Sequence, residues 1–348
     1  MADRVVRIGI CGLGSIGSAA TRLLLDHRAG FELVGAATKQ PEAVGRPLHE
    51  VVGAATQSDV RVVDQLDSLL DAHPDIIVFS TGSFLSVVRD DVERIAAAGC
   101  NLVSPCEELA FPFTRDPEFS HRLDATARRT GVTILGTGVN PGFIFDGLLT
   151  AASGSSWDVT SIRGRRVVDV SGFGQNIHRR LGIGYTDEEF TTGHEQGTIA
   201  GHVGFPESVQ LVVERLGLRL DGPIEESFEP MIALEAVNTP YGGVPAGHTE
   251  GFVQRAIGRV GGKVFIELEL LLHLRPVAAG FPTSDRFVID GMHPVSLELN
   301  PGMDAIPATS AQLVNSIPGV LRAPAGLMTI NDLPASAAWK DLTRRMLR

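Results

Sequence analysis

The chain of 348 residues contains only three cysteines, Cys11, Cys100 and Cys106, and no two of them are spaced as C-x-x-C. This odd set predicts neither a disulfide framework nor a thiolate metal site. Reduced thiols are typical of the cytoplasm, and the opening sequence Met-Ala-Asp-Arg-Val-Val has no signal-peptide pattern. We therefore expect a cytoplasmic protein.

Runs of basic residues and long apolar runs are also absent. The 41 acidic residues outnumber the 30 basic ones, which gives a net charge of −11 and argues against nucleic acid or an anionic membrane as a partner. No apolar run reaches the roughly 18 residues that span a bilayer. His194 and His202 are eight residues apart, with no acid or cysteine set to complete a site, so we expect no bound metal.

Glycine, in contrast, is abundant, and three of the 39 glycines form a G-x-G-x-x-G pattern between a β-type run and a helical pattern. In that context Gly12 allows a tight turn, Gly14 lets the backbone approach a pyrophosphate, and Gly17 lets helix and strand pack closely. The N–H groups that open the helix, at Ser15 and Ile16, would bind the phosphates. Ordinary loops also contain this pattern by chance, but its place here predicts a dinucleotide site.

The end of the second expected strand, Phe31–Ala37, indicates which dinucleotide binds. Enzymes that use NAD usually place an acid there for the ribose hydroxyls, whereas this sequence has Thr38-Lys39-Gln40. Thr38 and Lys39 could hold the 2′-phosphate of NADP, the alternative being a solvated loop lysine. Because the acid is missing, we expect NADP(H) to be preferred and NAD(H) to remain possible.

Two further strand ends are expected to lie beside the cofactor, because ligands of parallel sheets bind beyond the carboxyl ends of the strands. The residues that follow these strands are Ser80, Thr81 and Gly82 in one case and Asn140 and Pro141 in the other. Asn140 would bind the nicotinamide carboxamide. Turn formation alone is the alternative for both segments.

The loop after the intervening strand, Cys100–Ser104, carries two adjacent acids, Glu107 and Glu108, between apolar neighbours. A partly buried carboxylate at a strand end suits a general base. A helix N-terminus, which favours acids, is the alternative role and would account for one of the two. The sequence leaves open which of them faces the substrate.

From Trp157 onward the pattern changes to strands, of which Val264–Arg275 is the longest and alternates as a half-buried strand does. We predict a Rossmann-type doubly wound parallel sheet over residues 1–150, followed over 151–302 by an α+β domain with a mixed or antiparallel sheet. A helix from Phe143 would lead out of the first domain, and residues 303–348 would form a C-terminal helical segment. We place a homodimer contact on the open face of the second sheet.

The second domain must also shape the substrate pocket. Candidate lining residues, which the sequence does not rank, are Phe143, His178, Tyr185, His194 and His202. A substrate that carries a carboxylate would need a basic side chain, for which the candidates are Arg163, Arg165, Arg179 and Arg180. Whether the substrate carries one stays open.

Four segments together resemble the 2,4-diaminopentanoate dehydrogenases and the related native amine dehydrogenases. They are Gly12–Gly17, Cys106–Leu109, Gly138–Phe143 and Gly201–Ser208, with further similarity near the C-terminus at Val314–Pro318 and Ala323–Leu327. The first motif is generic, whereas the Glu-Glu and Asn-Pro-Gly-Phe motifs together are more specific. The His-His loop, lysine and Gly-Thr motif of true dihydrodipicolinate reductases are missing.

The resemblance implies a dihydrodipicolinate-reductase-like architecture, a homodimer, and a C-terminal segment that packs back on the nucleotide domain. It also implies NAD(P)-dependent interconversion of a small amine with a carbonyl compound and ammonia. The family's catalytic glutamate corresponds to Glu108, with Glu107 as the alternate. The competing hypotheses are a hydroxyl-directed enzyme similar to homoserine dehydrogenase and a non-catalytic NADP-binding sensor.

Overall fold

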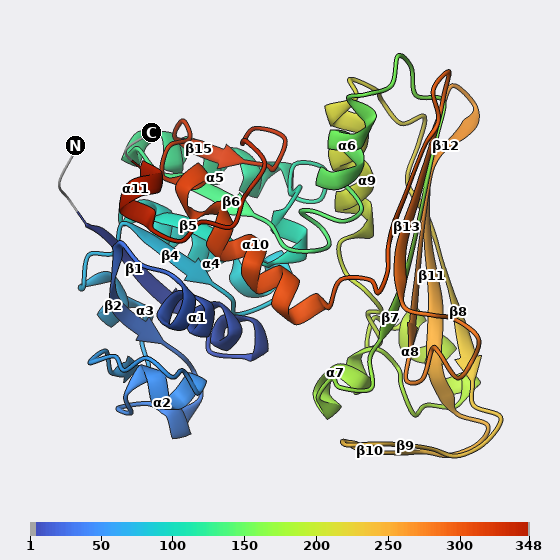
Figure 1. Ribbon diagram of the computed structural model, residues 1–348, viewed down its shortest axis with the longest axis horizontal. Helices are drawn as coiled ribbons and strands as arrows, with labels where there is room; N and C mark the ends of the chain where they lie inside the picture. The colour runs from blue at the N-terminus through green and yellow to red at the C-terminus, as the bar shows by residue number, and fades with distance from the viewer. Residues whose placement is uncertain (1–4, 347–348) are drawn as a thin grey trace. The chain divides into compact units, whose positions relative to one another are not determined.

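The computed structural model describes residues 5–346, which form two compact units (Figure 1). One unit combines Met1–Phe143 with Ala305–Arg348, and the other is the continuous segment Ile144–Asp304. The divisions predicted from the sequence lie at 150 and 302. Helix α6 (Gly147–Ser153), which crosses residue 150, lies in the second unit and packs on its sheet.

The first unit is built on a seven-stranded parallel sheet with the order β15-β6-β5-β4-β1-β2-β3. The strands are β1 (Val6–Cys11), β2 (Phe31–Ala37), β3 (Val62–Val63), β4 (Ile76–Phe79), β5 (Asn101–Ser104), β6 (Thr133–Gly136) and β15 (Gly326–Met328). The chain winds outward from β1 to β3 and then crosses to β4 on the other side of β1. The order therefore reverses beside β1, which is where sheets of this kind bind ligands. This is the doubly wound parallel sheet that the sequence predicts.

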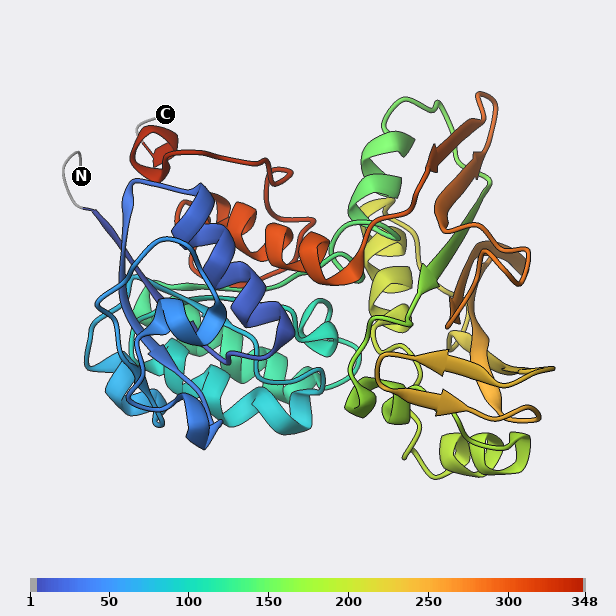
Figure 2. The same ribbon diagram turned by 60° about the horizontal axis from the view of Figure 1, so that its bottom comes forward.

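Helices cover both faces of this sheet (Figure 2). One core lies under α3 (Leu66–Leu70), α4 (Leu85–Ala97) and α5 (Pro117–Thr130). The other lies under α1 (Ser15–His27), α2 (Leu48–Val52), α10 (Ala305–Val320) and α11 (Leu342–Met346). The 3-10 turns η1 (Pro41–Ala43) and η2 (Glu107–Leu109) occupy loops between strands and helices. Burial on both faces explains the unbroken apolar sequence of β4.

Two local predictions are wrong. No helix begins at Phe143: the chain turns there, because Gly142 has φ +127, and α6 begins only at Gly147, whose N–H donates to the Asp146 carboxylate at 2.6 Å. The C-terminal segment is not only helical, because β15 extends the parallel sheet beside β6. Its three residues are too few for a strand pattern to be recognised in the sequence.

The second unit contains a six-stranded mixed sheet with the order β14-β13-β7-β12-β11-β8. Its strands are β7 (Ser161–Asp169), β8 (Glu225–Ile232), β11 (Thr249–Val260), β12 (Lys263–His273), β13 (Ser284–Asp290) and β14 (Val295–Leu299). Only the pair β7 and β12 is parallel. Strands β11 and β12 form a hairpin that turns at Gly261 and Gly262, and both glycines have positive φ.

Helices α6 and α9 (Phe205–Arg215) pack on one face of this sheet (Figure 1). The remaining elements are α7 (Gln175–Arg180), α8 (Asp187–Glu195) and a separate two-stranded hairpin of β9 (Val237–Thr239) and β10 (Gly242–Val244). The opposite face carries a row of ion pairs that runs across four strands through Glu229, Arg255, Glu269 and Arg165.

Strand β12 follows the predicted alternation only in its middle part, over residues 266–270. Glu267 and Glu269 are partly exposed between buried residues, but Leu271 and His273 on the same face are buried, and Val264 on the opposite face is 38% exposed. Gly251, which lies opposite His273 on β11, leaves room for the His273 ring, since a Cβ there would lie 2.8 Å from it. Half-burial is therefore a property of the middle of the strand only.

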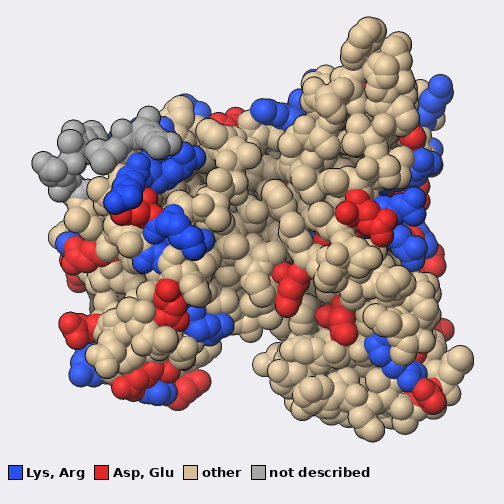
Figure 3. Space-filling model, viewed as in Figure 1, with Lys and Arg blue, Asp and Glu red and all other residues tan. Residues whose placement is uncertain are grey.

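The described surface mixes both signs of charge. On the face drawn in Figure 3, basic and acidic side chains form small groups separated by wide areas of other residues. Within residues 5–346, no helix combines the length and apolar character needed to cross a membrane. The three cysteines are free and buried.

Candidate active site

The glycine loop joins β1 to α1, and two of its three glycines are required by the packing of the protein itself. Gly12 has φ +93, and a Cβ there would lie 2.3 Å from the Ser80 carbonyl oxygen. A Cβ on Gly17 would lie 1.9 Å from the carbonyl oxygen of Gly12. Ser80 strengthens this contact, because its Oγ donates to the same Gly12 oxygen at 3.0 Å.

Gly14 differs from the other two glycines. A Cβ at Gly14 would meet no heavy atom within 4 Å, and its φ of −70 is open to any residue. Packing within the protein therefore gives no reason for glycine, whereas the close approach of a pyrophosphate does. Gly14 and Ser15 are exposed and Ile16 partly so, and no side chain caps the start of α1. The first N–H groups of the helix thus suit a phosphate group.

The end of β2 places Thr38 and Lys39 beside this loop. Thr38 is buried, and its N–H donates to the Val63 carbonyl at 3.0 Å, while the Lys39 side chain is exposed. Burial raises the pKa of the Cys11 thiol at the end of β1 to about 12, and the positive charge of Lys39 acts in the opposite direction. Lys39 therefore lies close enough to the end of β1 to affect it electrostatically.

The loop after β4 connects the glycine loop to the Glu-Glu turn. Thr81 is exposed, and Gly82 and Ser83 are partly buried. The Ser83 carbonyl accepts from the Glu108 N–H at 3.4 Å and from the Cys106 Sγ at 3.2 Å. The carboxyl ends of β4 and β5 are therefore linked by direct hydrogen bonds.

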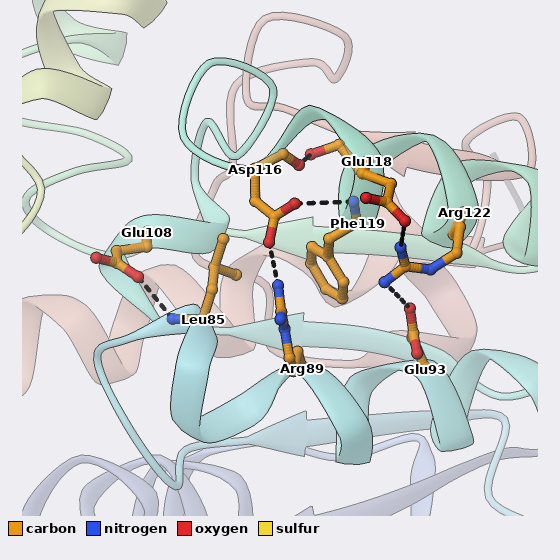
Figure 4. Close-up of polar contacts among 9 residues, drawn as sticks. Leu85, Arg89, Glu93, Glu108, Asp116, Glu118, Phe119 and Arg122 are labelled. Atoms are coloured by element: carbon orange, nitrogen blue, oxygen red, sulfur yellow. Dashed lines mark hydrogen bonds and ion pairs between the residues drawn. The ribbon is translucent and has the colours of Figure 1, made fainter.

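Glu107 and Glu108 lie in the 3-10 turn η2 and differ in burial: Glu108 is 8% exposed, and Glu107 is more exposed. One carboxylate oxygen of Glu108 accepts from the Leu85 N–H, the first of helix α4, at 2.7 Å (Figure 4). The other lies 3.2 Å from the Arg115 guanidinium. Glu108 therefore lies at a strand end, as expected of a general base, and also binds a helix N-terminus. These two roles were alternatives in the prediction from the sequence.

The Asn140 turn adjoins the same edge of the sheet. A Cβ at Gly136, the last residue of β6, would lie 2.4 Å from the backbone of Leu109, so the Glu-Glu turn packs directly against β6. Asn140 is 9% exposed, and the preceding N–H, of Val139, donates to the Thr309 hydroxyl of α10 at 3.2 Å. The first unit thus brings its predicted residues from the ends of β1, β2, β4, β5 and β6 to one edge of the sheet.

The predicted pocket residues of the second unit occupy different environments. His178 is buried, its Nε2 lies 2.7 Å from the Val170 carbonyl, and its ring contacts Tyr241. Tyr185 is partly exposed, and its carbonyl accepts from the Thr249 N–H at 2.7 Å. The His194 ring contacts the Phe228 ring, with centroids 3.9 Å apart and planes tilted by 44°. Phe143, the last residue of the first unit, is partly buried in the turn before α6.

His202 differs from the other histidines in its electrostatic surroundings. Burial, together with the positive charges of Arg166 and Arg180, lowers the pKa of its ring to about 3. The Gln254 side chain binds both the N–H and the carbonyl of His202, at 2.9 and 3.0 Å, and its ring contacts Phe205. The ring is consequently neutral at ordinary pH and lies close to two guanidinium groups.

Arg166 on β7 is the functional candidate that the sequence analysis missed. It is 2% exposed, its Nε lies 3.4 Å from Asp285, and its Nη2 donates to the Met303 carbonyl. Its Nη1 is buried and has no hydrogen-bond partner among the described residues. Burial lowers the pKa of Arg166, while Asp285 and Asp304 act against that shift. A buried guanidinium with one unused donor suits an anionic ligand group.

The four arginines named from the sequence are less suitable. Arg163 pairs with Asp290 and Arg165 with Glu269, both largely exposed, and Arg179 donates to Asn176. Arg180 is partly buried near His202. The alternation along β7, in which Ile162 and Gly164 are buried, was the signal that could have identified Arg166. No group of three or more His, Cys, Asp or Glu in the described part of the chain is arranged to hold a metal.

A doubly wound parallel sheet with a glycine loop where its strand order reverses, followed by a second α+β unit, defines an NAD(P)-dependent dehydrogenase. Residues 12–136 match the family model of the homoserine dehydrogenase NAD binding domain, and residues 143–348 match that of the 2,4-diaminopentanoate dehydrogenase C-terminal domain. The chain belongs to the 2,4-diaminopentanoate dehydrogenase family and is an oxidoreductase that acts on CH–NH2 groups.

Individual relatives agree over nearly the whole length. The chain is 33% identical to the 2,4-diaminopentanoate dehydrogenase of Acetoanaerobium sticklandii over 335 residues, covering 96% of this chain and 94% of the relative. It is 24% identical to an amine dehydrogenase of Streptomyces virginiae, covering 97% and 98%. The structure of an amine dehydrogenase from Mycobacterium smegmatis superimposes with a TM-score of 0.86, at 27% identity and 98% and 99% coverage.

A homoserine dehydrogenase from Thiobacillus denitrificans has a TM-score of only 0.51 at 15% identity, covering 97% of this chain and 80% of that one, so the two share a fold alone. The hydroxyl-directed alternative therefore has support only from the nucleotide-binding part of the chain. The hypothesis of an amine dehydrogenase has support from both the nucleotide-binding part and the C-terminal part of the chain.

Proposed function

We propose that the protein interconverts a small, carboxylate-bearing amine with the corresponding carbonyl compound and ammonia, that it prefers NADP(H), and that Glu108 is the general base. The observation that carries the proposal is the buried carboxylate of Glu108 at the carboxyl end of β5, which accepts one hydrogen bond from the backbone and forms one ion pair. The relative that is 33% identical is named for 2,4-diaminopentanoate, a diamine with one carboxylate.

Amine oxidation needs a base because an ammonium group has no free lone pair to expel the hydride. Glu108 would accept that proton and leave a neutral amine. When bound, the nicotinamide supplies the acceptor for the hydride. Water would then add to the resulting substrate iminium, ammonia would leave, and the carbonyl compound would remain. In the reductive direction Glu108 would return the proton.

Two groups support the choice of substrate and cofactor. In the second unit, the unpartnered Nη1 of Arg166, with the neutral ring of His202 nearby, is our candidate for binding a substrate carboxylate. In the first unit, Thr38 and Lys39 stand where an acid would select NAD, and Lys39 is exposed beside the glycine loop. Gly12, Gly14 and Gly17 would hold the pyrophosphate, and Asn140 the carboxamide.

Replacement of the base tests the central claim. Glu108→Gln keeps the size of the side chain but removes its basicity, so we expect kcat for oxidation of 2,4-diaminopentanoate to fall by roughly 10²-fold or more. The dissociation constants of NADP(H), measured by fluorescence titration, should stay within about twofold of the wild type. Glu107→Gln is the matched control and should retain most activity.

Two results would contradict the assignment. If both variants keep ammonia-dependent turnover near the wild-type rate from pH 7 to 10, neither glutamate is the base. If the wild type oxidises NADPH with a carbonyl compound equally well without ammonia, the enzyme acts on hydroxyl groups.

We further propose a homodimer formed through the sheet face that carries the ion pairs of Arg255, Glu269 and Arg165. This face is partly exposed and mixes charged with apolar residues, as interfaces between subunits do. Light scattering should give twice the chain mass of 37.0 kDa. Arg255→Glu should shift the mass toward one chain. A wild-type mass of one chain at micromolar concentration would exclude this dimer.

A further inference from the structure

The carboxylate of Glu108 is part of a ring of contacts that includes the N-terminal part of helix α4 and the residues just before α5. The residues in this ring are Leu85, Arg89, Asp116, Arg115 and Glu108. The Leu85 N–H donates to Glu108, and four residues further along α4 the Arg89 guanidinium is paired with Asp116 (Figure 4). Asp116 follows Arg115 in the chain, and Arg115 pairs with Glu108 at 3.2 Å.

Asp116 fixes the chain next to Arg115. Its carboxylate caps α5 by accepting from the Phe119 N–H at 3.0 Å, and the Arg89 guanidinium that pairs with it also lies over the Phe119 ring, 5.5 Å from the centroid (Figure 4). The Asp116 N–H donates to the Pro112 carbonyl at 2.9 Å. The backbone that carries Arg115 is therefore held from both sides, and the guanidinium reaches Glu108 from an anchored position.

The charges around Glu108 leave Arg115 as its nearest positive partner among the described residues. Glu107 lies in the same turn, and burial raises the pKa of the neighbouring Cys106 thiol, so that this thiol is uncharged. Arg89 and Asp116 offset each other within their own ion pair. The remaining partners, the Leu85 N–H and the Ser83 carbonyl, are uncharged backbone groups.

We propose that Arg115 is a positioning residue for the amine dehydrogenase reaction: it holds the Glu108 carboxylate in the orientation in which it accepts the substrate proton. The inference rests on the proposed role of Glu108 as the base. A guanidinium at this distance fixes the plane of a carboxylate. Arg115 does not itself touch the reacting atoms in this scheme.

The test compares kcat and KM for 2,4-diaminopentanoate oxidation with NADP+. Arg115→Met removes the charge but keeps most of the side-chain length. We expect kcat to fall about tenfold while KM changes by less than twofold, because a carboxylate that is no longer held in one orientation accepts the proton less efficiently but is not needed to bind the substrate. Arg115→Lys should restore most of the wild-type kcat.

Arg122→Met is the matched control, since Arg122 on α5 makes comparable, more exposed ion pairs with Glu118 and Glu93 (Figure 4). It should leave both constants unchanged. Thermal unfolding of all variants separates loss of folding from loss of function, and the Arg115→Lys constants remain interpretable if the methionine variant unfolds. An Arg115→Met kcat equal to that of the wild type, or a rise in KM with kcat unchanged, overturns the inference. The proposed function fails separately, if Glu108→Gln stays active.

Discussion

Glu108 in the first unit and Arg166 in the second are both buried charged side chains, yet they use their hydrogen-bonding capacity differently. Each oxygen of Glu108 has a donor, one from the backbone of α4 and one from Arg115. Arg166 is bound to Asp285 and Met303 through two nitrogens, and its third is unpartnered within the described chain. Buried polar groups are normally paired, so an unpaired one marks a place where a ligand completes the set.

This difference in hydrogen bonding reflects two different tasks: holding a catalytic group in place and binding a ligand. A carboxylate that must accept a proton at a defined place benefits from being held on both sides. A guanidinium that must capture an anion benefits from a donor that the protein leaves unused, even though burial of that donor is costly. The two residues should therefore fail in different ways when they are replaced.

The largest predicted effect is a kinetic difference between variants of Glu108 and variants of Arg166. Glu108→Gln should lower kcat, whereas loss of Arg166 should raise KM for 2,4-diaminopentanoate by about 10- to 100-fold, as for a charged hydrogen bond, and leave kcat nearly unchanged. Because removing Arg166 alone would leave Asp285 buried without its partner, the informative variant is Arg166→Met with Asp285→Asn.

The controls sharpen this prediction. Arg165→Met removes the adjacent, half-exposed arginine and should change KM by less than twofold. Amines without a carboxylate should be indifferent to the Arg166 change. Since His202 has a pKa lowered to about 3, its ring stays neutral above pH 5 and adds no step to the pH dependence of KM between pH 6 and 9. Equal KM values for the double variant and the wild type would remove Arg166 from substrate binding.

A smaller effect concerns the cofactor end of the first unit. Lys39→Ala should weaken NADPH binding about tenfold and leave NADH binding unchanged, because an exposed lysine contributes less than a buried ion pair. Lys340→Ala, which removes another exposed lysine of the same unit, is the control. Isothermal titration with both cofactors measures the ratio. If Lys39→Ala leaves the NADPH-to-NADH ratio unaltered, the 2′-phosphate does not contact this residue.

Much of the first unit could be predicted from its sequence because its signals are local. The three glycines, the strand end at Thr38 and the Glu-Glu turn each combine a short motif with the strand that precedes it. The start of α6 could not be predicted, since a turn at Gly142 and a cap at Asp146 outweigh the apolar helical pattern of Phe143–Phe145. The strand β15 depends on pairing with β6, almost two hundred residues away in the sequence.

The second unit was harder to predict for a different reason. Its recognition candidate, Arg166, lies inside a strand and has no motif around it. Three of the five residues from 163 to 167 are arginines. Only the register of β7 in the sheet separates the buried arginine, Arg166, from the two exposed ones. The ring of His202 likewise becomes distinctive only through Arg166 and Arg180, which approach it in space.

The return of the C-terminal segment to the first unit affects how the protein is made. Helix α10 buries Leu313, Val314 and Ile317 in the core that α1 shares, and none of these residues exists until the second unit has been synthesised. At 5–20 residues per second, the roughly 160 intervening residues take about 8 to 30 seconds to translate. During that time the nascent first unit presents an apolar sheet face and the open edge of β6 to the surrounding solution, while the continuous second unit is free to fold on the ribosome.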